Sequence, residues 1–292
     1  MLATGVAEVL RLEEAFDSPE AAAAFWVEGM SDAGERELTY PGACGAARVA
    51  RLYPGRGQGT LMYIHGGGWS GGRIALNHRA CRLLAAHSGW DVVSVSYRLA
   101  PEHPYPAGLE DCRAAHGWLC AQGRALGLNT AKIALGGASA GGNLALALGL
   151  ALGGGLDGLV LFYPVTGADF DRSSYLSYAS GYGLTRARMQ ALFDLYDPGA
   201  ARRHVDPLIS PLVASDAALR AARLPATCLI LAECDVLADD GIAMAARLRD
   251  AGVRTDLHVE PGVTHGFINR GRLIPAADAC LARAAHFLES LS

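Results

Sequence analysis

The sequence predicts an α/β protein in which helices flank a mostly parallel central sheet. From residue 60 onward, short apolar runs alternate with helical patterns, which is typical of βα units. A glycine-rich stretch at residues 136–143 joins one apolar run to an Ala/Leu-rich helical pattern. The 292 residues are 51% hydrophobic and 18% charged, so the chain can bury a large core without disulfides or metals.

The predicted elements follow one another in regular order along the chain. We expect an early edge strand and then the strands of the sheet, at residues 47–52, 60–65, 91–97, 132–136, 158–163, 226–233 and 254–260. We expect helices at residues 75–88, 107–126, 140–152, 239–251 and 275–291. Large α/β units of this length are often one domain, so we interpret residues 1–292 as a single domain.

Two segments interrupt this alternation. Residues 1–36 have a helical pattern with an apolar face that includes Phe25 and Trp26. Residues 166–212 form a polar, Tyr-rich turn region with a helix near residues 186–196. Insertions on α/β scaffolds usually lie over the carboxyl edge of the sheet, where sites form. We therefore expect these two segments to form a helical cap, with surface decoration as the alternative.

Charge and composition exclude several classes of protein. The net charge of -4 gives no electrostatic reason to expect a nucleic-acid partner. The N-terminus lacks the basic start and apolar stretch of a secretory signal, and the apolar runs at residues 144–152 and 159–165 are too short to span a bilayer. The seven cysteines are scattered without a CxxC pair, which indicates reduced thiols. We expect a cytoplasmic protein without a membrane span.

The strongest local motif is G-A-S-A-G at residues 137–141, which has the G-x-S-x-G pattern of a nucleophile elbow. A short predicted strand precedes it and a predicted helix follows, as this motif requires. The serine of such a turn needs neighbours without side chains two residues before and after it, and Gly137 and Gly141 occupy these positions. The motif therefore predicts Ser139 as a nucleophile at the top of an α/β-hydrolase sheet.

A second motif, HGGGW at residues 65–69, follows the first predicted parallel strand. Acyl transfer places negative charge on the former carbonyl oxygen, and backbone amides of glycines can approach that oxygen closely. We expect the amides of Gly67, Gly68 and Ala140 to form an oxyanion hole. His65 is interpreted as a brace for the loop.

The same loop also matches the dinucleotide fingerprint GxGxxG through Gly66, Gly68 and Gly71. In that fingerprint, an acidic residue about 20 residues further on ends the next strand. Here the next strand ends on Tyr97 and Arg98. The sequence therefore disfavours nucleotide binding.

The remaining catalytic residues should follow Ser139 in the order acid and then histidine. His265 lies in a glycine-flanked loop after the last predicted strand. Other histidines lie within predicted elements: His258 in that strand, His286 in the last helix, and His78, His87 and His116 in earlier helices. Asp235 ends the strand before it. Its rivals as the acid are Glu233, Asp239 and Asp240; the two aspartates start a helix, where N-capping and the helix dipole explain them.

These residues predict acyl transfer through a covalent intermediate, with Ser139 as nucleophile, His265 as base and Asp235 as the residue that orients the base. No cofactor is needed, and the histidines and cysteines do not have the spacing of a metal site.

Several motifs together resemble the bacterial hormone-sensitive-lipase-like esterases over residues 38–290. The matching stretches are HGGGW (65–69), YRLAPEHPYPA (97–107), GGASAGGN (136–143), DPLISPL (206–212), AECDVLADDG (232–241) and GVTHGF (262–267). This resemblance implies an α/β-hydrolase fold with a cap, and the same triad and oxyanion residues. The chain differs from the usual family elbow at Ala138, where aspartate or threonine is common.

The function predicted from these features is hydrolysis of small-molecule carboxylic esters with short- to medium-chain acyl groups. An amidase or arylformamidase is the alternative within the hydrolases, and a non-catalytic ligand receptor is the alternative outside them. From their positions we expect Trp26, Trp69, His204 and Phe267 to contact substrate. The sequence leaves the oligomeric state open between a monomer and a homodimer.

Overall fold

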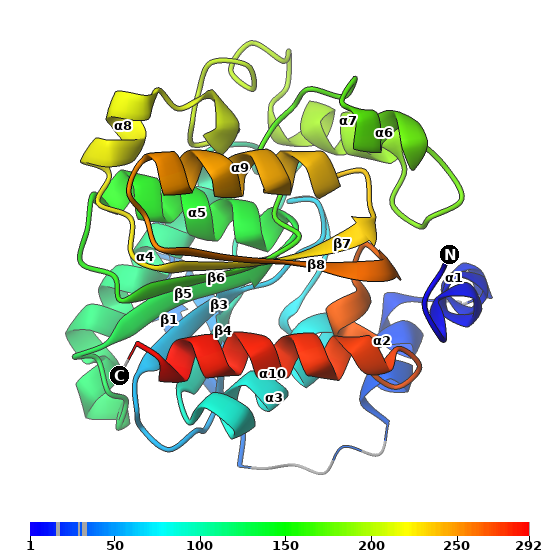
Figure 1. The fold of residues 1–292 in the computed structure, drawn as a ribbon. Helices are drawn as coiled ribbons and strands as arrows, with labels where there is room; N and C mark the ends of the chain where they lie inside the picture. Colours follow the sequence, from blue (N-terminus) through cyan, green and yellow to red (C-terminus); the bar gives the residue numbers. More distant parts are fainter. Residues whose placement is uncertain (16–17, 29, 31–33, 292) are drawn as a thin grey trace.

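The computed structural model describes residues 1–15, 18–28, 30 and 34–291, which form helical layers on both faces of one twisted sheet (Figure 1). Within this part of the chain the sheet has eight strands in the order β1-β2-β4-β3-β5-β6-β7-β8. The strands are β1 (Arg36–Pro41), β2 (Ala47–Tyr53), β3 (Thr60–Ile64), β4 (Asp91–Val95), β5 (Ile133–Ala138), β6 (Gly158–Phe162), β7 (Thr227–Cys234) and β8 (Thr255–Thr264). Strand β2 pairs antiparallel with β1 and β4, and the other pairs are parallel, as predicted.

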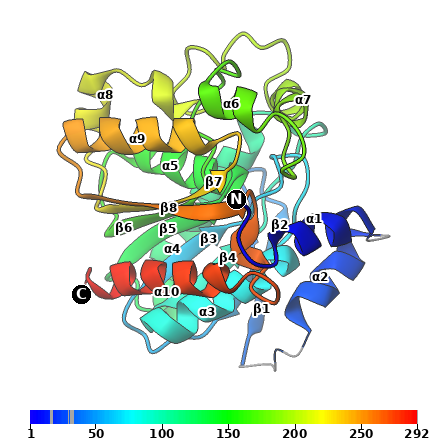
Figure 2. The same cartoon turned by 45° about the vertical axis from the view of Figure 1, so that its right-hand side comes forward.

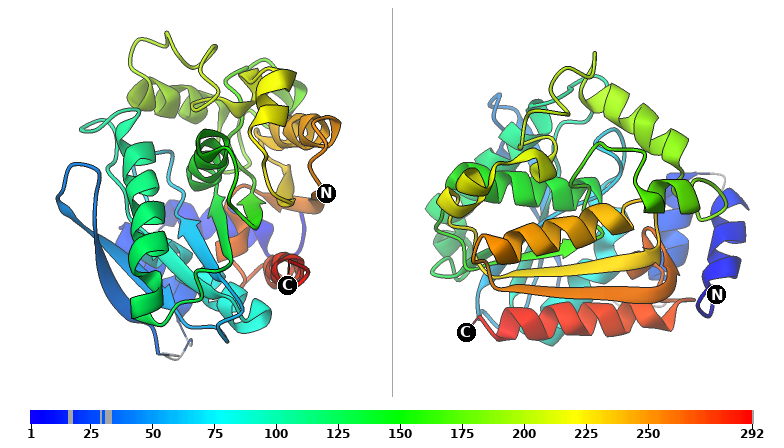
Figure 3. Two further views of the ribbon diagram at one scale, coloured as in Figure 1. Left: turned by 90° about the vertical axis from the view of Figure 1, so that its left-hand side faces the viewer. Right: turned by 45° about the horizontal axis from the view of Figure 1, so that its top comes forward.

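The central strands are buried on both faces because helices cover them. Every residue of β3, β4, β5 and β6 is buried, which explains their nearly continuous apolar sequences. Helices α3 (His78–Ser88) and α10 (Pro275–Glu289) pack on one face. Helices α4 (Ala107–Gln122), α5 (Ala140–Leu152) and α9 (Ala238–Asp250) pack on the other. Figure 3 shows the same layers from two further directions.

The segments predicted as a cap lie near the edge at which the parallel strands end (Figures 1 and 2). Residues 1–36 supply helices α1 (Val6–Ala15) and α2 (Pro19–Val27). Residues 166–212 supply α6 (Ser173–Ser177) and α7 (Arg186–Tyr196). The side chain of Thr185 caps α7 by accepting a hydrogen bond from the Arg188 amide, so this helix begins where the sequence predicted.

Some elements differ from the sequence prediction. Strand β1 was not predicted because its residues are mostly exposed and polar, as expected for the edge of a sheet. Strand β8 continues to Thr264, four residues beyond its predicted end, after a register irregularity with β7 near Ala232. Helices α6 and α8 (Asp216–Ala221) are too short for a clear helical period.

Two predictions about the whole chain can also be compared with the structure. In the described residues, no helix has both the length and the apolar character needed to cross a bilayer. The seven cysteines are free thiols and five of them are buried, as the scattered spacing indicated.

Candidate active site

Ser139 occupies a sharp turn between β5 and α5. Its backbone has φ 56° and ψ -121°, a conformation that is costly for a residue with a side chain. A side chain on Gly137 would place its Cβ 2.5 Å from the Gly141 carbonyl oxygen, and one on Gly141 would overlap the Ile64 carbonyl. The Ser139 amide donates to the Phe162 carbonyl at 2.9 Å, which ties the turn to β6. The two glycines therefore allow the turn that the G-x-S-x-G motif predicted.

Asp235 and His265 follow the last two strands of the sheet and meet Ser139 at their common edge. The distance from His265 Nδ1 to Asp235 Oδ2 is 2.6 Å, and from His265 Nε2 to Ser139 Oγ it is 2.8 Å. Because an ionised carboxylate only accepts hydrogen bonds, Nδ1 carries a proton, and in neutral His265 the other nitrogen accepts from the Ser139 hydroxyl. The second oxygen of Asp235 accepts from the Leu237 amide at 3.0 Å. The three side chains thus form a continuous hydrogen-bonded chain.

The other acidic candidates have different partners. Glu233 accepts a hydrogen bond from the Gly262 amide at 2.6 Å, which holds the backbone that precedes His265. Asp239 accepts from the Ser174 amide at 2.8 Å. Asp240 lies 2.8 Å from the Arg172 guanidinium. Among the four acidic candidates, only Asp235 is bonded to His265 in the structure.

The glycine loop after β3 (residues 65–69) lies beside Ser139 and His265. Gly66, Gly67 and Gly68 line one cavity together with Ser139 and His265. Gly67 and Gly68 have φ of +124° and +61°, a region that favours glycine. Their conformation brings backbone rather than side chain to the cavity wall.

Ala140 is the first residue of α5 and is buried beside Ser139, outside the cavity lining. The first amides of a helix have no acceptor within the helix, and they lie at the positive end of its dipole. The amide of Ala140 is therefore suited to receive negative charge next to the Ser139 hydroxyl.

His65 braces the glycine loop. Its ring stacks on Tyr97 with centroids 4.4 Å apart, and its Nδ1 lies 2.8 Å from the Gly66 carbonyl oxygen. A carbonyl only accepts, so Nδ1 carries the proton. Burial lowers the pKa of His65 to about 4, so the ring is neutral at pH 7. The contacts agree with the role that the sequence indicated.

The cavity beside Ser139 has a volume of about 330 Å³. Segment 166–212 supplies one wall through Leu184, Arg188, Met189 and Leu192, of which the last three belong to α7. No described residue of segment 1–36 lines this cavity. The two segments predicted as one cap therefore have different relations to the cavity.

The structure places the four predicted substrate contacts outside the cavity lining. Trp69 is buried and stacks on Tyr196, and Phe267 is buried behind Tyr163. Trp26 is buried under the Arg270 guanidinium, and His204 is on the surface. The expectation relied on chain position, whereas packing turns the three aromatic side chains into the core, where they remove most apolar surface from water.

Sequence reasoning missed several residues at the site. Tyr163 lines the cavity, and its ring centroid lies 4.7 Å from that of His265. Arg270 and Asn269 line it beyond His265. Asn143, the last residue of the GGASAGGN stretch, is buried and bonded to Trp69 of the glycine loop. Its place one helical turn after Ser139 was the available signal, because a polar residue on a buried helix needs partners.

The fold and the Ser139–His265–Asp235 geometry are those of a serine hydrolase. A family described as alpha/beta hydrolase fold matches residues 61–269 of the chain. The chain therefore belongs to this family, and the resemblance that the motifs indicated is confirmed.

Two proteins similar to this chain are ester hydrolases. An ethyl acetate hydrolase of Pseudomonas putida is 37% identical over 235 residues, which cover 79% of this chain and 72% of that protein. A carboxylesterase of Mycobacterium tuberculosis is 38% identical over 238 residues, covering 78% and 74% of the two chains.

Solved structures extend the similarity to nearly the full length. An alpha/beta hydrolase enzyme from the metagenome of Lake Arreo has a TM-score of 0.88 at 30% identity, with 99% of this chain and 98% of that chain covered. A thermostable esterase from Pseudomonas putida has a TM-score of 0.84 at 30% identity, with 98% and 96% covered.

Proposed function

We propose that this α/β hydrolase cleaves small-molecule carboxylic esters through an acyl-enzyme formed on Ser139. The observation that carries the proposal is the hydrogen-bonded chain from Ser139 Oγ through His265 to Asp235, with distances of 2.8 and 2.6 Å. The ester hydrolases among its relatives support the same chemistry.

The proposed reaction has two stages, each with one proton carried by His265. Ser139 Oγ attacks the ester carbonyl while His265 Nε2 takes the hydroxyl proton, and the alcohol leaves with that proton. Water then attacks the acyl-enzyme, giving its proton to His265, and the acid departs as Ser139 is reprotonated. Asp235 holds the tautomer of His265 and stabilises the imidazolium in both stages. The reaction needs neither a metal nor an organic cofactor.

The oxyanion that forms in each stage is proposed to lie between Gly67, Gly68 and Ala140. These residues flank Ser139 from two sides, and their amides belong to a glycine loop and to the start of a helix. Removing one such donor typically reduces kcat by about two to three orders of magnitude.

The proposed substrates carry short- to medium-chain acyl groups. A cavity of about 330 Å³ is at the lower end of small-molecule sites, and apolar side chains of Leu184, Met189 and Leu192 form one wall. We assign the cap over this cavity to segment 166–212. Segment 1–36 contacts the cavity through a residue of its wall, Arg270. Glu13 forms an ion pair with Arg270, and the Trp26 ring lies under the same guanidinium.

The test is a series of p-nitrophenyl esters from acetate to palmitate, with arylformamide substrates in parallel. We expect the highest kcat/KM for acyl chains of about two to eight carbons and at least tenfold lower values for arylformamides. Faster turnover of arylformamides would favour the amidase alternative. Stoichiometric binding of esters without turnover would favour the receptor alternative.

A further inference from the structure

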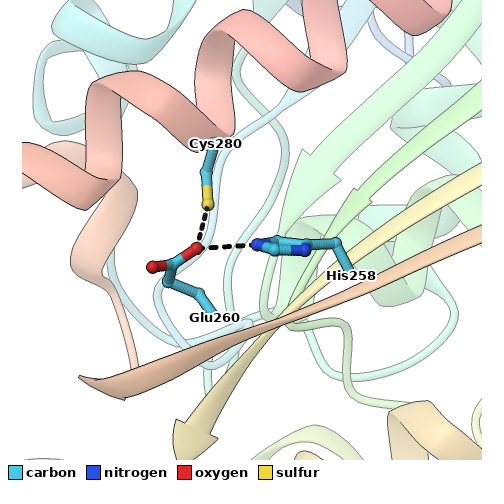
Figure 4. A group of neighbouring side chains, drawn as sticks. All are labelled: His258, Glu260 and Cys280. Carbon is cyan, nitrogen blue, oxygen red and sulfur yellow. Dashed lines mark hydrogen bonds and ion pairs between the residues drawn. The ribbon is translucent and has the colours of Figure 1, made fainter.

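A second group of chemically reactive side chains lies away from Ser139, between the edge strand β8 and helix α10. His258 and Glu260 are two residues apart on β8, so both side chains point to the same face of the sheet. Helix α10 covers this face and presents Cys280 from its second turn. Figure 4 shows the three side chains converging from these two elements.

The donor atoms of the three residues are close enough to share one ion. They all lie within 4.8 Å of one another. Glu260 Oε2 is 2.7 Å from His258 Nε2 and 3.3 Å from Cys280 Sγ, so the carboxylate stands between the imidazole and the thiol. Zinc binds nitrogen, oxygen and sulfur at about 2.0–2.3 Å, which separates tetrahedral ligand atoms by roughly 3.3–3.8 Å. Side-chain rotations that move these atoms by about 1 Å would therefore create zinc geometry.

The three side chains differ in their exposure to solvent, so an ion could enter from the side of His258 and Glu260 and be held by Cys280 on the buried side. Cys280 is 1% exposed, whereas the side chains of His258 and Glu260 are 27% and 20% exposed. The sulfur would thus lie beneath the ion, and solvent could supply a fourth ligand from the open side.

The donor set favours zinc over magnesium or calcium. Thiolate and imidazole are soft or borderline ligands that suit zinc, whereas magnesium and calcium prefer oxygen ligands. We propose that His258, Glu260 and Cys280 bind one zinc ion with water as the fourth ligand, and that the ion links strand β8 to helix α10. The hydrolysis proposed above does not use this ion.

Coordination would change the protonation of the cluster in a defined way. Burial and the hydrogen bond to Glu260 raise the pKa of the Cys280 thiol, so the thiol is protonated in metal-free protein. Binding forms the bond between zinc and sulfur, breaks the S–H bond and releases one proton to solvent. An ionised carboxylate only accepts hydrogen bonds, so His258 Nε2 carries the proton of its bond to Glu260. Binding of zinc through Nε2 therefore also requires that this proton move to Nδ1 or to solvent.

The experiment uses full-length protein stripped of metal by a chelator that is then removed. Zn²⁺ is titrated by calorimetry, and Co²⁺ is titrated while the near-ultraviolet absorption of a cobalt–thiolate bond is recorded. We expect one equivalent of either ion, a thiolate band with Co²⁺ and no binding of Mg²⁺. Cys280→Ser should remove the band and weaken Zn²⁺ binding by at least about tenfold, as even losses in the outer shell of metal sites do. Its hydroxyl can still donate to Glu260, which favours retention of the fold.

His258→Gln provides a second variant that leaves the buried thiol in place, and it should also weaken Zn²⁺ binding at least about tenfold. The matched control is Cys120→Ser, because Cys120 is exposed and its sulfur lies 3.7 Å from His116 Nε2. We expect this control to bind like the wild type.

Binding that is absent, or that persists unchanged in Cys280→Ser or His258→Gln, would overturn the zinc site. So would binding that disappears in Cys120→Ser. Hydrolysis of p-nitrophenyl acetate is followed in parallel in metal-free wild type and metal-free Ser139→Ala, and the difference between them reports on Ser139. Failure of the zinc site and failure of the proposed function therefore give different results.

Discussion

The indole nitrogen of Trp69 donates a hydrogen bond to the side-chain oxygen of Asn143, 3.2 Å away. Trp69 ends the glycine loop, and Asn143 lies in the first turn of α5, so this bond joins the two segments on either side of Ser139. The amide nitrogen of Asn143 donates to the carbonyls of Val165 and Ile209, both at 2.9 Å. One buried side chain therefore connects the glycine loop, α5, the loop that follows β6 and segment 166–212.

Asn143→Ala should destabilise the protein and slow turnover. The substitution leaves the indole N–H and two carbonyls without their partner in a buried site, so we expect a loss of about 2–4 kcal/mol in the free energy of unfolding. Urea denaturation measures the loss, and kcat should fall more than KM rises because the glycine loop is less well held. Trp69→Phe removes only one of the three bonds and should cost less. Equal stability of Asn143→Ala and wild type would contradict this role.

Gly68→Ala should lower kcat/KM for p-nitrophenyl acetate by about two orders of magnitude. The added Cβ would displace the Gly68 amide from the oxyanion, and loss of one donor typically costs that much. The backbone of Gly68 has φ +61°, and its Cβ would lie 2.5 Å from Leu192 Cδ1. Adding Leu192→Ala removes that clash, so the double variant should recover part of the activity. Gly67→Ala is the control, because its Cβ would overlap the Gly71 carbonyl, which cannot be trimmed. If Leu192→Ala restored activity to neither variant, or to both, the predicted contact between position 68 and Leu192 would be wrong.

Met189→Ala should raise the ratio of hexanoate to acetate kcat/KM at least threefold. Met189 is buried and lines the cavity, so its truncation adds room for methylene groups, each of which contributes about 0.8 kcal/mol when buried. Val9→Ala is the matched control in segment 1–36, because Val9 is buried in α1 but does not line the cavity. It should lower stability and leave the ratio unchanged. If the ratio changed only in Val9→Ala, the cap would have to be assigned to segment 1–36 instead of segment 166–212.

His65 should make the protein sensitive to acid. Burial lowers its pKa from the ordinary 6.5 to about 4, so between these values the unfolded chain binds more protons than the folded one. The free energy of unfolding should therefore fall as pH falls from about 6.5 to about 4. His65→Asn lacks this titration, so its stability relative to wild type should improve over the same range. Parallel Tm-against-pH curves for the two proteins would contradict the assignment.

The parts of the site that local sequence could predict are those fixed by local backbone chemistry. The turn at Ser139 requires glycine at positions 137 and 141, and the order of the strands brings Asp235 and His265 to the same edge. This information is visible along the chain, because each residue follows a strand.

The parts that sequence reasoning missed depend on packing between distant segments. Asn143 meets Ile209 across 66 positions, and Arg270 is held by Glu13 across 257. An aromatic residue near a motif, such as Trp69, can face either the cavity or the core, and the sequence pattern does not state which. Segment 166–212 was recognised as an insertion, but which of its residues line the cavity follows from the orientation of α7.

The role of Ser139 as the nucleophile activated by His265 is tested most directly by the site of covalent labelling. Wild-type protein treated with a serine-directed organophosphate should gain one equivalent of mass, located at Ser139 by peptide mass spectrometry, in step with loss of ester hydrolysis. Ser139→Ala should bind no label, keep its fold and lose at least about three orders of magnitude in kcat. Labelling at another serine, or near-normal turnover by Ser139→Ala, would contradict the account.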